Sequence, residues 1–175
     1  MMRVFVAVDI SDHITDVISE FQASSGIGGK PVRPHNMHFT LQFLGDIHDN
    51  SKRVIAAFSG MAFSKFDIKL QGLGTFPEKG SPRIVWVGTD SAGGQKLCEL
   101  SEMVRHTLAP LGYSNSTAFK PHVTIFRLKP RDTVSRLAEF AETSFGMQQV
   151  LTIKLKQSIL NKDGPTYTDL AEVAA

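Results

Sequence analysis

The sequence is short of cysteine and of long apolar runs, and each shortage excludes a class of protein. Cys98 is the only cysteine among 175 residues, so an internal disulfide and a zinc site made of thiolates are both excluded. A chain without disulfides is typical of the reducing cytoplasm, where we expect this protein. No stretch approaches the roughly 20 apolar residues that a membrane helix needs. Asp9 interrupts the N-terminal apolar run, so no secretory signal is expected either.

Net charge is also small. Nineteen Lys and Arg against 17 Asp and Glu leave +2, too little for a protein that coats nucleic acid in general. Any binding of a phosphate compound must therefore come from a local basic patch. The hydrophobic fraction of 42% and the charged fraction of 21% are typical of a globular protein. A chain of this length forms one domain or two small fused halves.

Strand and helix patterns alternate along the chain in an order that occurs twice. Each half is expected to run strand, helix, strand, helix, strand. Strands are predicted at 3–10, 37–44, 65–76, 83–88, 122–128 and 149–160. Helices are predicted around 14–21, 54–62, 97–111 and 134–141, and a hairpin turn at 161–164 leads into a returning strand. The sequence thus predicts an α/β (α+β) domain over 1–175, made of two pseudo-symmetric halves at about 1–77 and 83–175.

One short motif is written twice in this repeat. "HFTL" begins at His38, and "HVTI" begins at His122, 84 residues later (122 − 38). The tripeptide "IKL" at 68–70 recurs at 153–155, an offset of 85, so two landmarks support an internal duplication. Because a strand points alternate side chains to opposite faces, each motif presents its His and Thr on one side. Those pairs are His38 with Thr40, and His122 with Thr124.

Two facing histidines are suited to breaking a phosphodiester. An imidazole with a pKa of about 6.5 can act as acid or base near neutrality. One ring can deprotonate an attacking water while the other protonates the departing ribose oxygen. The threonine hydroxyls can hold the non-bridging phosphate oxygens. None of these steps needs a metal.

Two structural alternatives compete with this interpretation. Each histidine alone could simply be half-buried and hydrogen-bonded to the neighbouring threonine. A metal cluster of His35, His38 and His48 is disfavoured because no carboxylate follows at zinc-like spacing. The doubling of the motif, in matching strands at the offset of the repeat, favours the catalytic interpretation.

The doubled motif and the segments around it resemble those of a known enzyme family. The two H-x-T-x motifs are those of the 2H phosphoesterases, and "MRVFVAVDI", "NMHFTLQFLGDI", "SPRIVWVG" and "FKPHVTIFR" are similar to the corresponding segments of the RNA 2′,3′-cyclic phosphodiesterases, also called 2′-5′ RNA ligase-like or LigT-like proteins. The resemblance covers nearly the whole chain. It implies a bilobal fold, with two largely antiparallel sheets facing a central cleft and helices outside.

The resemblance also implies an activity. An RNA ending in a 2′,3′-cyclic phosphate, such as one derived from tRNA, would be hydrolysed to a 2′-phosphate. His38 would be the general acid and His122 the general base, with no metal and no cofactor. Some relatives also join RNA ends reversibly through a 2′-5′ linkage. We further expect a monomer with no membrane partner.

Two positions near the motifs bear on phosphate binding. Many relatives carry Lys where this chain has Gln42, which removes one cation next to the first motif. Arg127 stands five residues after His122, as in many relatives. Strict alternation points it away from His122, so a bulge or strand twist would be needed to bring it into the site.

Other residues are weaker candidates. Lys120 and Arg83 are candidate phosphate ligands, although exposed surface positions are the commoner role of such residues. Phe126 is a candidate for stacking on a base because it shares parity with His122. Phe43 lies opposite His38 by parity and is expected in the core.

Two other functions stay open from the residues alone. The same machinery would serve a small cyclic nucleotide or a 2′-5′-linked oligonucleotide as substrate. A non-catalytic module that binds RNA ends would keep the groove without turnover, although the presence of both histidines and both threonines weighs against it.

Overall fold

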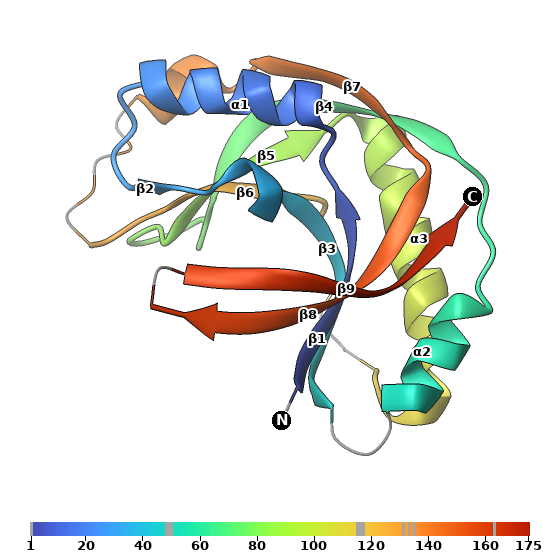
Figure 1. Cartoon of the computed structure of the whole chain (residues 1–175). Helices are drawn as coiled ribbons and strands as arrows, with labels where there is room; N and C mark the ends of the chain where they lie inside the picture. Colours follow the sequence, from blue (N-terminus) through green and yellow to red (C-terminus); the bar gives the residue numbers. More distant parts are fainter. Residues whose placement is uncertain are drawn as a thin grey trace.

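The computed structural model describes residues 2–47, 51–114, 118–130, 132, 134, 136–162 and 164–175. Within them the chain forms a long curved sheet with α-helices packed on its outer side (Figure 1). The strands are β1 Met2–Asp9, β2 Lys30–Pro31, β3 His38–Ile47, β4 Phe66–Phe76, β5 Ile84–Thr89, β6 Val123–Arg127, β7 Ser144–Val150, β8 Thr152–Asn161 and β9 Gly164–Ala174. The helices are α1 Asp12–Ser24, α2 Ser51–Ser59 and α3 Ser91–Leu108, with short 3₁₀ turns at Pro34–Asn36, Ala109–Leu111 and Leu137–Phe140. The predicted mixed α/β class is confirmed.

The sheet is antiparallel throughout its described pairings and has a narrow seam in the middle. Its order is β7-β4-β5-β6-β3-β1-β8-β9, with β2 added to β6. Strands β3 and β6 meet through one residue pair, Phe39 with Val123, whereas the other neighbours along this order pair over four or more residues. The two expected sheets are therefore two lobes of one continuous sheet.

This seam positions the two motifs. Phe39 is the second residue of the first motif, and Val123 is the second residue of the other. In an antiparallel pair, the residues on either side of such partners run in opposite directions. The His38 end of the first motif therefore lies toward the Thr124 end of the second, in a local two-fold arrangement.

The strand pairing exchanges elements between the two halves of the sequence. β4, from the first half, pairs with β5 and β7. β8 and β9, at the end of the chain, extend the sheet from β1. Each lobe thus contains strands from both halves. The division at about 1–77 and 83–175 stays a prediction about the repeat in the sequence, and it does not coincide with the lobes.

Three helices pack on the sheet through apolar faces. Ile14 and Ile18 are the buried residues of the α1 stripe, and that helix packs against β7. α2 packs against β9 and α3. α3 begins where the Asp90 side chain accepts a hydrogen bond from the Gly93 N–H at 3.3 Å, and it packs on β3, β4 and β5. Its buried leucines and valine, at spacings of three and four, form the face that the sequence predicts.

Two predicted elements differ from the structure. Where a helix is expected around 134–141, the described residues form a 3₁₀ turn at Leu137–Phe140, shortly before β7 begins at Ser144. The strand expected at 149–160 is two strands, β7 and β8, which belong to different lobes. The chain changes lobe at Leu151, which is half exposed. No helix in the described part of the chain is long and apolar enough to cross a bilayer.

Candidate active site

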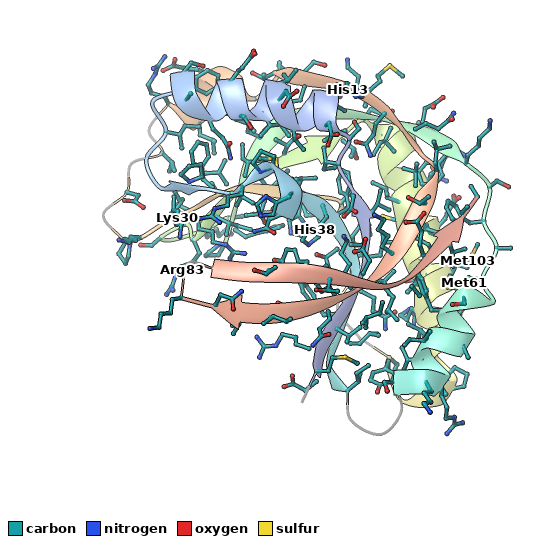
Figure 2. The ribbon with its side chains drawn as sticks, in the orientation of Figure 1. His13, Lys30, His38, Met61, Arg83 and Met103 are labelled. Carbon is teal, nitrogen blue, oxygen red and sulfur yellow. The ribbon has the colours of Figure 1, made fainter. Side chains whose placement is uncertain are left out.

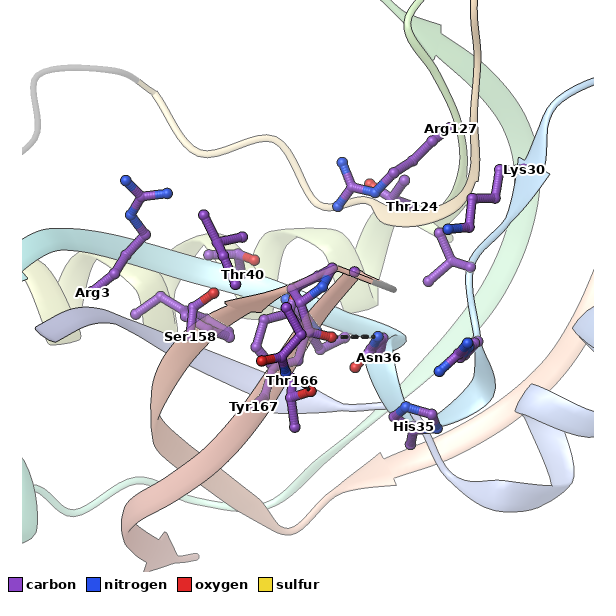
Figure 3. A pocket seen from close by; sticks show the side chains of 18 of the residues that line it. Arg3, Lys30, His35, Asn36, Thr40, Thr124, Arg127, Ser158, Thr166 and Tyr167 are labelled. Atoms are coloured by element: carbon purple, nitrogen blue, oxygen red, sulfur yellow. Dashed lines mark hydrogen bonds between the residues drawn. The ribbon is translucent and has the colours of Figure 1, made fainter.

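A cavity of about 600 Å³ lies at the seam between the lobes and brings the two motifs together. His38, Thr40, His122 and Thr124 all line it, although the motifs are half a chain apart in sequence. Figure 3 shows Thr40 and Thr124 approaching from β3 and β6. The remaining walls come from β1, β2, the 3₁₀ turn after β2 and the β8–β9 hairpin.

The His38 ring is held between two aromatic rings. Its centroid lies 5.0 Å from that of Phe5 in a stacked arrangement and 5.2 Å from that of Tyr167 edge-on. Its Nδ1 is buried, which leaves Nε2 as the nitrogen that can act in the cavity. Burial lowers the pKa of His38 to about 4, since a charged imidazolium loses hydration there. Asp9 opposes this shift by raising the pKa, and the Lys156 ammonium adds to it by lowering the pKa.

An ion-pair network lies behind His38. Lys156 is only 6% exposed, and its Nζ lies 3.0 Å from Asp9 Oδ2 and 2.7 Å from Asp169 Oδ1. Lys154 Nζ contacts the same two carboxylates at 3.2 and 3.0 Å. Asp9 is also the β1 partner of His38 in the sheet. The charge next to the histidine is therefore fixed by the backbone pairing of β1 with β3 and β8.

The His122 ring is oriented by one hydrogen bond. Its Nδ1 lies 2.7 Å from the Lys120 carbonyl oxygen, which can only accept, so Nδ1 carries the proton and Nε2 keeps a lone pair. Phe76 packs edge-on at 5.0 Å between centroids, and Trp86 lies at 6.4 Å. Burial lowers the pKa of His122, and the Lys120 ammonium lowers it further, whereas the Lys120 carbonyl raises it. A neutral His122 with this tautomer is a ready proton acceptor.

A β-bulge brings Arg127 to the cavity. The β5–β6 register pairs Val85 with Phe126 and Trp86 with Thr124, so Ile125 is an extra residue in β6. The extra residue breaks the alternation and puts Thr124 and Arg127 on the same face. Arg127 lines the cavity, as Figure 3 shows. The bulge that the sequence argument required for this arginine is therefore present.

The first motif contains the matching bulge. The β1–β3 register pairs Val6 with Gln42 and Ala7 with Thr40, so Leu41 is the extra residue. Phe43, five residues after His38, consequently turns to the cavity and is 61% exposed. The prediction that Phe43 lies in the core is wrong, because it assumed strict alternation. Gln42 instead points inward, is 4% exposed and donates its Nε2–H to the Tyr113 carbonyl at 2.7 Å. In this chain the position next to the motif faces away from the cavity.

The lining of the cavity is cationic. Arg3, Lys30, Arg33 and Arg127 contribute side chains, and none of the described lining residues is an aspartate or glutamate. A concave surface with one sign of charge concentrates ligands of the opposite sign. This is the local basic patch that the small net charge of the chain requires for a phosphate ligand.

The weaker candidates lie elsewhere. Lys120 does not line the cavity; its ammonium pairs with Glu78 and lies 5.0 Å from the Trp86 ring, while its carbonyl orients His122. Arg83 is exposed just before β5 and outside the lining residues, with its carbonyl accepting from the Leu128 N–H at 2.7 Å. Phe126 is 2% exposed in the core, because the bulge turns it inward, and it offers no ring face to a base.

Sequence reasoning missed the residues that the β8–β9 hairpin adds. Tyr167 packs against His38, and the Asn36 amide donates to the Pro165 carbonyl at 3.1 Å, which ties the hairpin to the 3₁₀ turn before the first motif (Figure 3). The turn signal at 161–164 predicts the hairpin, but nothing local indicates which strand it pairs with. Figure 2 shows His38 in the middle of the molecule, far from the exposed His13.

Metal ligands do not gather at this site within the described residues. The described residues contain no group of three His, Cys, Asp or Glu side chains close enough to hold a metal ion. His48, one member of the histidine cluster considered from the sequence, lies outside the described residues.

Comparison with known proteins agrees with this architecture. Residues 4–86 match the family model described as LigT like Phosphoesterase. The RNA 2′,3′-cyclic phosphodiesterase of Archaeoglobus fulgidus is 38% identical over 97% of this chain and 98% of its own, and that of Aquifex aeolicus is 37% identical over 98% and 96%. A crystal structure of a Thermus thermophilus protein superposes with a TM-score of 0.80 at 28% identity, covering 99% of this chain and 97% of that one. On this full-length similarity, the chain belongs to the LigT-like phosphoesterase family.

Proposed function

We propose that this protein is an enzyme that hydrolyses the 2′,3′-cyclic phosphodiester at an RNA end to a 2′-phosphomonoester, with His38 as acid and His122 as base. One observation carries the proposal: two His-x-Thr pairs from separate strands line a single cationic cavity. Relatives that match nearly the whole chain bear the name RNA 2′,3′-cyclic phosphodiesterase. The substrate class follows from combining that similarity with the cavity.

The reaction balances with these groups alone. A water attacks phosphorus while Nε2 of His122 takes its proton, and the bond from phosphorus to the ribose O3′ breaks. Protonated His38 donates its proton to that oxygen, which leaves a 2′-phosphate on the ribose. The two rings exchange a proton with solvent before the next turnover. No proton is gained or lost overall apart from the ionisation of the product.

The negative charge of the phosphate would be stabilised by hydroxyl and guanidinium groups that line the cavity. The Thr40 and Thr124 hydroxyls are short donors fixed on strands at the seam, suited to the non-bridging oxygens. Arg127 supplies a guanidinium that stays charged at any working pH. The pKa of about 4 for His38 belongs to the unliganded cavity. A bound phosphate is an anion, and it raises the pKa of both histidines, which favours the protonated acid when substrate is present.

Four narrower expectations belong to the same proposal: the location, the oligomeric state, the source of the RNA and the joining of RNA ends. We place the protein in the cytoplasm on the strength of its single cysteine, and we expect a monomer because the cavity is complete within one chain. An RNA derived from tRNA is one source of such ends. Joining through a 2′-5′ linkage would use the same groups in the same roles, with a ribose 5′-hydroxyl in place of water as the attacking group, and cleavage of that linkage would be the reverse step.

The test is a product assay in EDTA. An RNA ending in a 2′,3′-cyclic phosphate is incubated with the protein, and the phosphomonoester isomer is identified by chromatography against 2′- and 3′-phosphate standards. We expect the 2′ isomer, formed at an unchanged rate with the chelator. A 3′ product would reverse the assignment of the leaving oxygen. Tight binding with no product in a single turnover would instead indicate an RNA-end binding module.

A substrate panel separates the remaining alternatives. Nucleoside 2′,3′-cyclic phosphates, a 3′,5′-cyclic nucleotide and a 2′-5′-linked oligonucleotide are compared with the RNA end at equal concentration. We expect the highest kcat/KM for the RNA end. A higher value for either of the last two would move the protein to a different substrate within the same chemistry.

A further inference from the structure

Gln22 of α1 lies outside the cavity lining, yet its side chain holds the backbone of one cavity wall. Its Nε2 group donates to the Ile125 carbonyl at 2.7 Å and to the Val32 carbonyl at 3.1 Å. An amide nitrogen carries two hydrogens, so both donors of this half-buried side chain are used. Gln22 therefore joins α1 to β6 and to the stretch after β2 at a single point.

The Ile125 carbonyl belongs to the bulge that turns Arg127 toward the cavity. Ile125 is the extra residue of β6, and a bulge disrupts the regular ladder around it. Its carbonyl accepts the Val32 N–H at 2.9 Å as well as the Gln22 amide, which uses both lone pairs of the oxygen. Because Arg127 follows two residues later, the donors that fix Ile125 also fix the position from which the guanidinium extends.

Two further cations of the cavity belong to the same junction. Lys30 pairs with Arg127 in the β2–β6 ladder, and Arg33 directly follows Val32. All three cations line the cavity, and Figure 3 shows Lys30 and Arg127 on neighbouring strands. Gly29, just before β2, lies so close to β6 that a Cβ would be 2.9 Å from the Arg127 carbonyl oxygen. The cationic wall is thus built by close backbone contact, and Gln22 ties that contact to α1.

The charge of Arg127 acts on the opposite side of the site. Burial raises the pKa of the Tyr167 hydroxyl, and the Arg127 guanidinium opposes this shift by lowering the pKa. Tyr167 packs edge-on against His38, which belongs to the other motif. A guanidinium that extends from β6 and acts on the group beside His38 is suited to a phosphate held between the two histidines.

The bulge of the first motif has a comparable support. Leu41 is the extra residue of β3, and its carbonyl accepts a hydrogen bond from the Ser101 hydroxyl of α3 at 2.8 Å. Ser101 is only 7% exposed. Each bulge is therefore held by a polar side chain from a helix, although the two donors are different residue types. The repetition of this arrangement favours a role for the donors in shaping the site.

We propose that Gln22 is a positioning residue for phosphate binding, because its amide fixes the Ile125 bulge and the Val32 segment so that Arg127 faces the phosphate. Gln22 touches no ligand and acts through Arg127. The inference rests on the proposed function only in taking a phosphate group as the ligand of the cavity. It does not depend on which histidine is the acid. Without the two donors, the bulge is less firmly held and the guanidinium spends less time directed at the phosphate.

A double-mutant cycle on phosphate binding tests this coupling. The Kd for inorganic phosphate is measured by calorimetry in wild type, Gln22→Met, Arg127→Met and the double variant, since methionine has a similar length but cannot donate. Arg127→Met should raise Kd by about 10- to 100-fold, the loss of a charged hydrogen bond. Gln22→Met should raise Kd about fivefold in wild type and hardly at all in the Arg127→Met background. An equal rise in both backgrounds, or none in either, would overturn the proposal.

A matched glutamine provides the control for the substitution itself. Gln95 is exposed on α3, outside the lining, and its amide donates to the Glu99 carboxylate at 3.0 Å. Gln95→Met should leave the phosphate Kd unchanged. Urea denaturation of each variant measures stability, because a purely structural role of Gln22 would lower stability without any coupling to Arg127. A wild type that shows the coupling but cleaves no cyclic phosphate would refute the proposed function and leave the role of Gln22 intact.

Hydrogen exchange in the wild type makes the test independent of any substitution. Coupling between two sites is reciprocal, so phosphate held by Arg127 should stabilise the bulge in turn. Saturating phosphate should therefore slow exchange of the Val32 amide, which donates to Ile125, by about tenfold. The Gly72 amide, which donates to the Thr143 carbonyl outside the cavity lining, is the reference and should slow less. If Val32 slows no more than Gly72, the bulge is not coupled to phosphate and the proposal fails.

Discussion

The two histidines differ in what holds them, and the difference fits different roles. His122 has a defined tautomer because a carbonyl fixes its Nδ1 proton. His38 sits between aromatic rings, with Asp9 and Lys156 competing over its charge. Both histidines have a lowered pKa, so both imidazole rings are neutral near pH 7 when no ligand is bound. In the proposed mechanism, the negative charge of an arriving phosphate raises the pKa of His38 and so favours its protonated form.

The first prediction at this scale concerns stability against pH. Above pH 6.5 His38 is neutral in the folded and unfolded chains, and it contributes no pH dependence. As the pH falls from 6.5 to about 4, the unfolded chain takes up a proton that the folded chain refuses, so the free energy of unfolding decreases. The loss from a shift of this size is about 3 kcal/mol. Chemical denaturation should show the wild type losing about this much more than His38→Gln over the same pH range, because His122 and the other titrating groups act in both proteins, and parallel curves would contradict the lowered pKa.

A second prediction for the two histidines concerns the pH dependence of kcat/KM and kcat. In the proposed mechanism, the productive free enzyme has His38 protonated and His122 neutral, and kcat/KM then has its maximum between the two pKa values. Since both values are lowered from 6.5, we expect the optimum of kcat/KM below pH 6.5. The kcat profile, which reports the substrate complex, should lie at higher pH because the bound phosphate raises both values. Stopped assays from pH 4 to 9 give both profiles, and a kcat/KM optimum above pH 6.5 would contradict the account.

At the scale of elements, the seam strands are positioned by close packing behind them. Gly74 of β4 faces Trp86 of β5 so tightly that a Cβ would lie 2.2 Å from the indole ring. Trp86 in turn lies beside His122. Glycine is needed at this position for space rather than for its backbone angles.

We therefore predict that Gly74→Ala displaces Trp86 and misplaces His122. The expected loss in kcat/KM is about tenfold or more, because small displacements of a catalytic group are costly. Trp86 is the only tryptophan, so its fluorescence reports the displacement directly. Gly60→Ala is the control, since the added Cβ would meet backbone oxygens at ordinary distances of 3.6 Å. Unchanged emission and rate in Gly74→Ala would show that the indole relaxes without consequence for the histidine.

The bulges mark where sequence reasoning fails at this scale. Alternation correctly groups His38 with Thr40 and His122 with Thr124, since these pairs precede the extra residues. Beyond Leu41 and Ile125 the parity reverses, and Phe43 is then assigned to the wrong face. A bulge depends on the register against a neighbouring strand that is distant in sequence, so it leaves no local signal. For Arg127, a bulge was expected only because the arginine must face the cavity if it binds the phosphate.

At the scale of the whole molecule, the repeat in the sequence predicts the elements but not their exchange. β4 and β8 contain the repeated "IKL", yet they belong to different lobes. Each of these strands pairs with at least one strand that is distant in the sequence, and the sequence of a short apolar strand does not indicate which strand it pairs with. The pairing of the two motifs could still be predicted, because they lie on the central strands β3 and β6 and do not depend on the order of the outer strands.

The cationic lining gives a prediction about salt. A longer RNA contacts more phosphates than a mononucleotide, so log KM should rise more steeply with log salt for the RNA, by about 0.7 for each additional contacted phosphate on a single strand. Arg3→Gln should reduce the slope for the RNA by a similar amount. Initial rates between 50 and 500 mM KCl measure the slopes. Equal slopes for both substrates would show that the cavity binds one phosphate only.

The central claim is that His38 and His122 act on one phosphate in one step, and a double-mutant cycle tests it most directly. His38→Ala, His122→Ala and the double variant are assayed on an RNA 2′,3′-cyclic phosphate in EDTA, with circular dichroism as the check on folding. Groups that act as a unit have non-additive effects, so each single variant should lose several orders of magnitude and the double variant should be hardly worse. A folded single variant that hydrolyses the RNA end at the wild-type rate would contradict the claim.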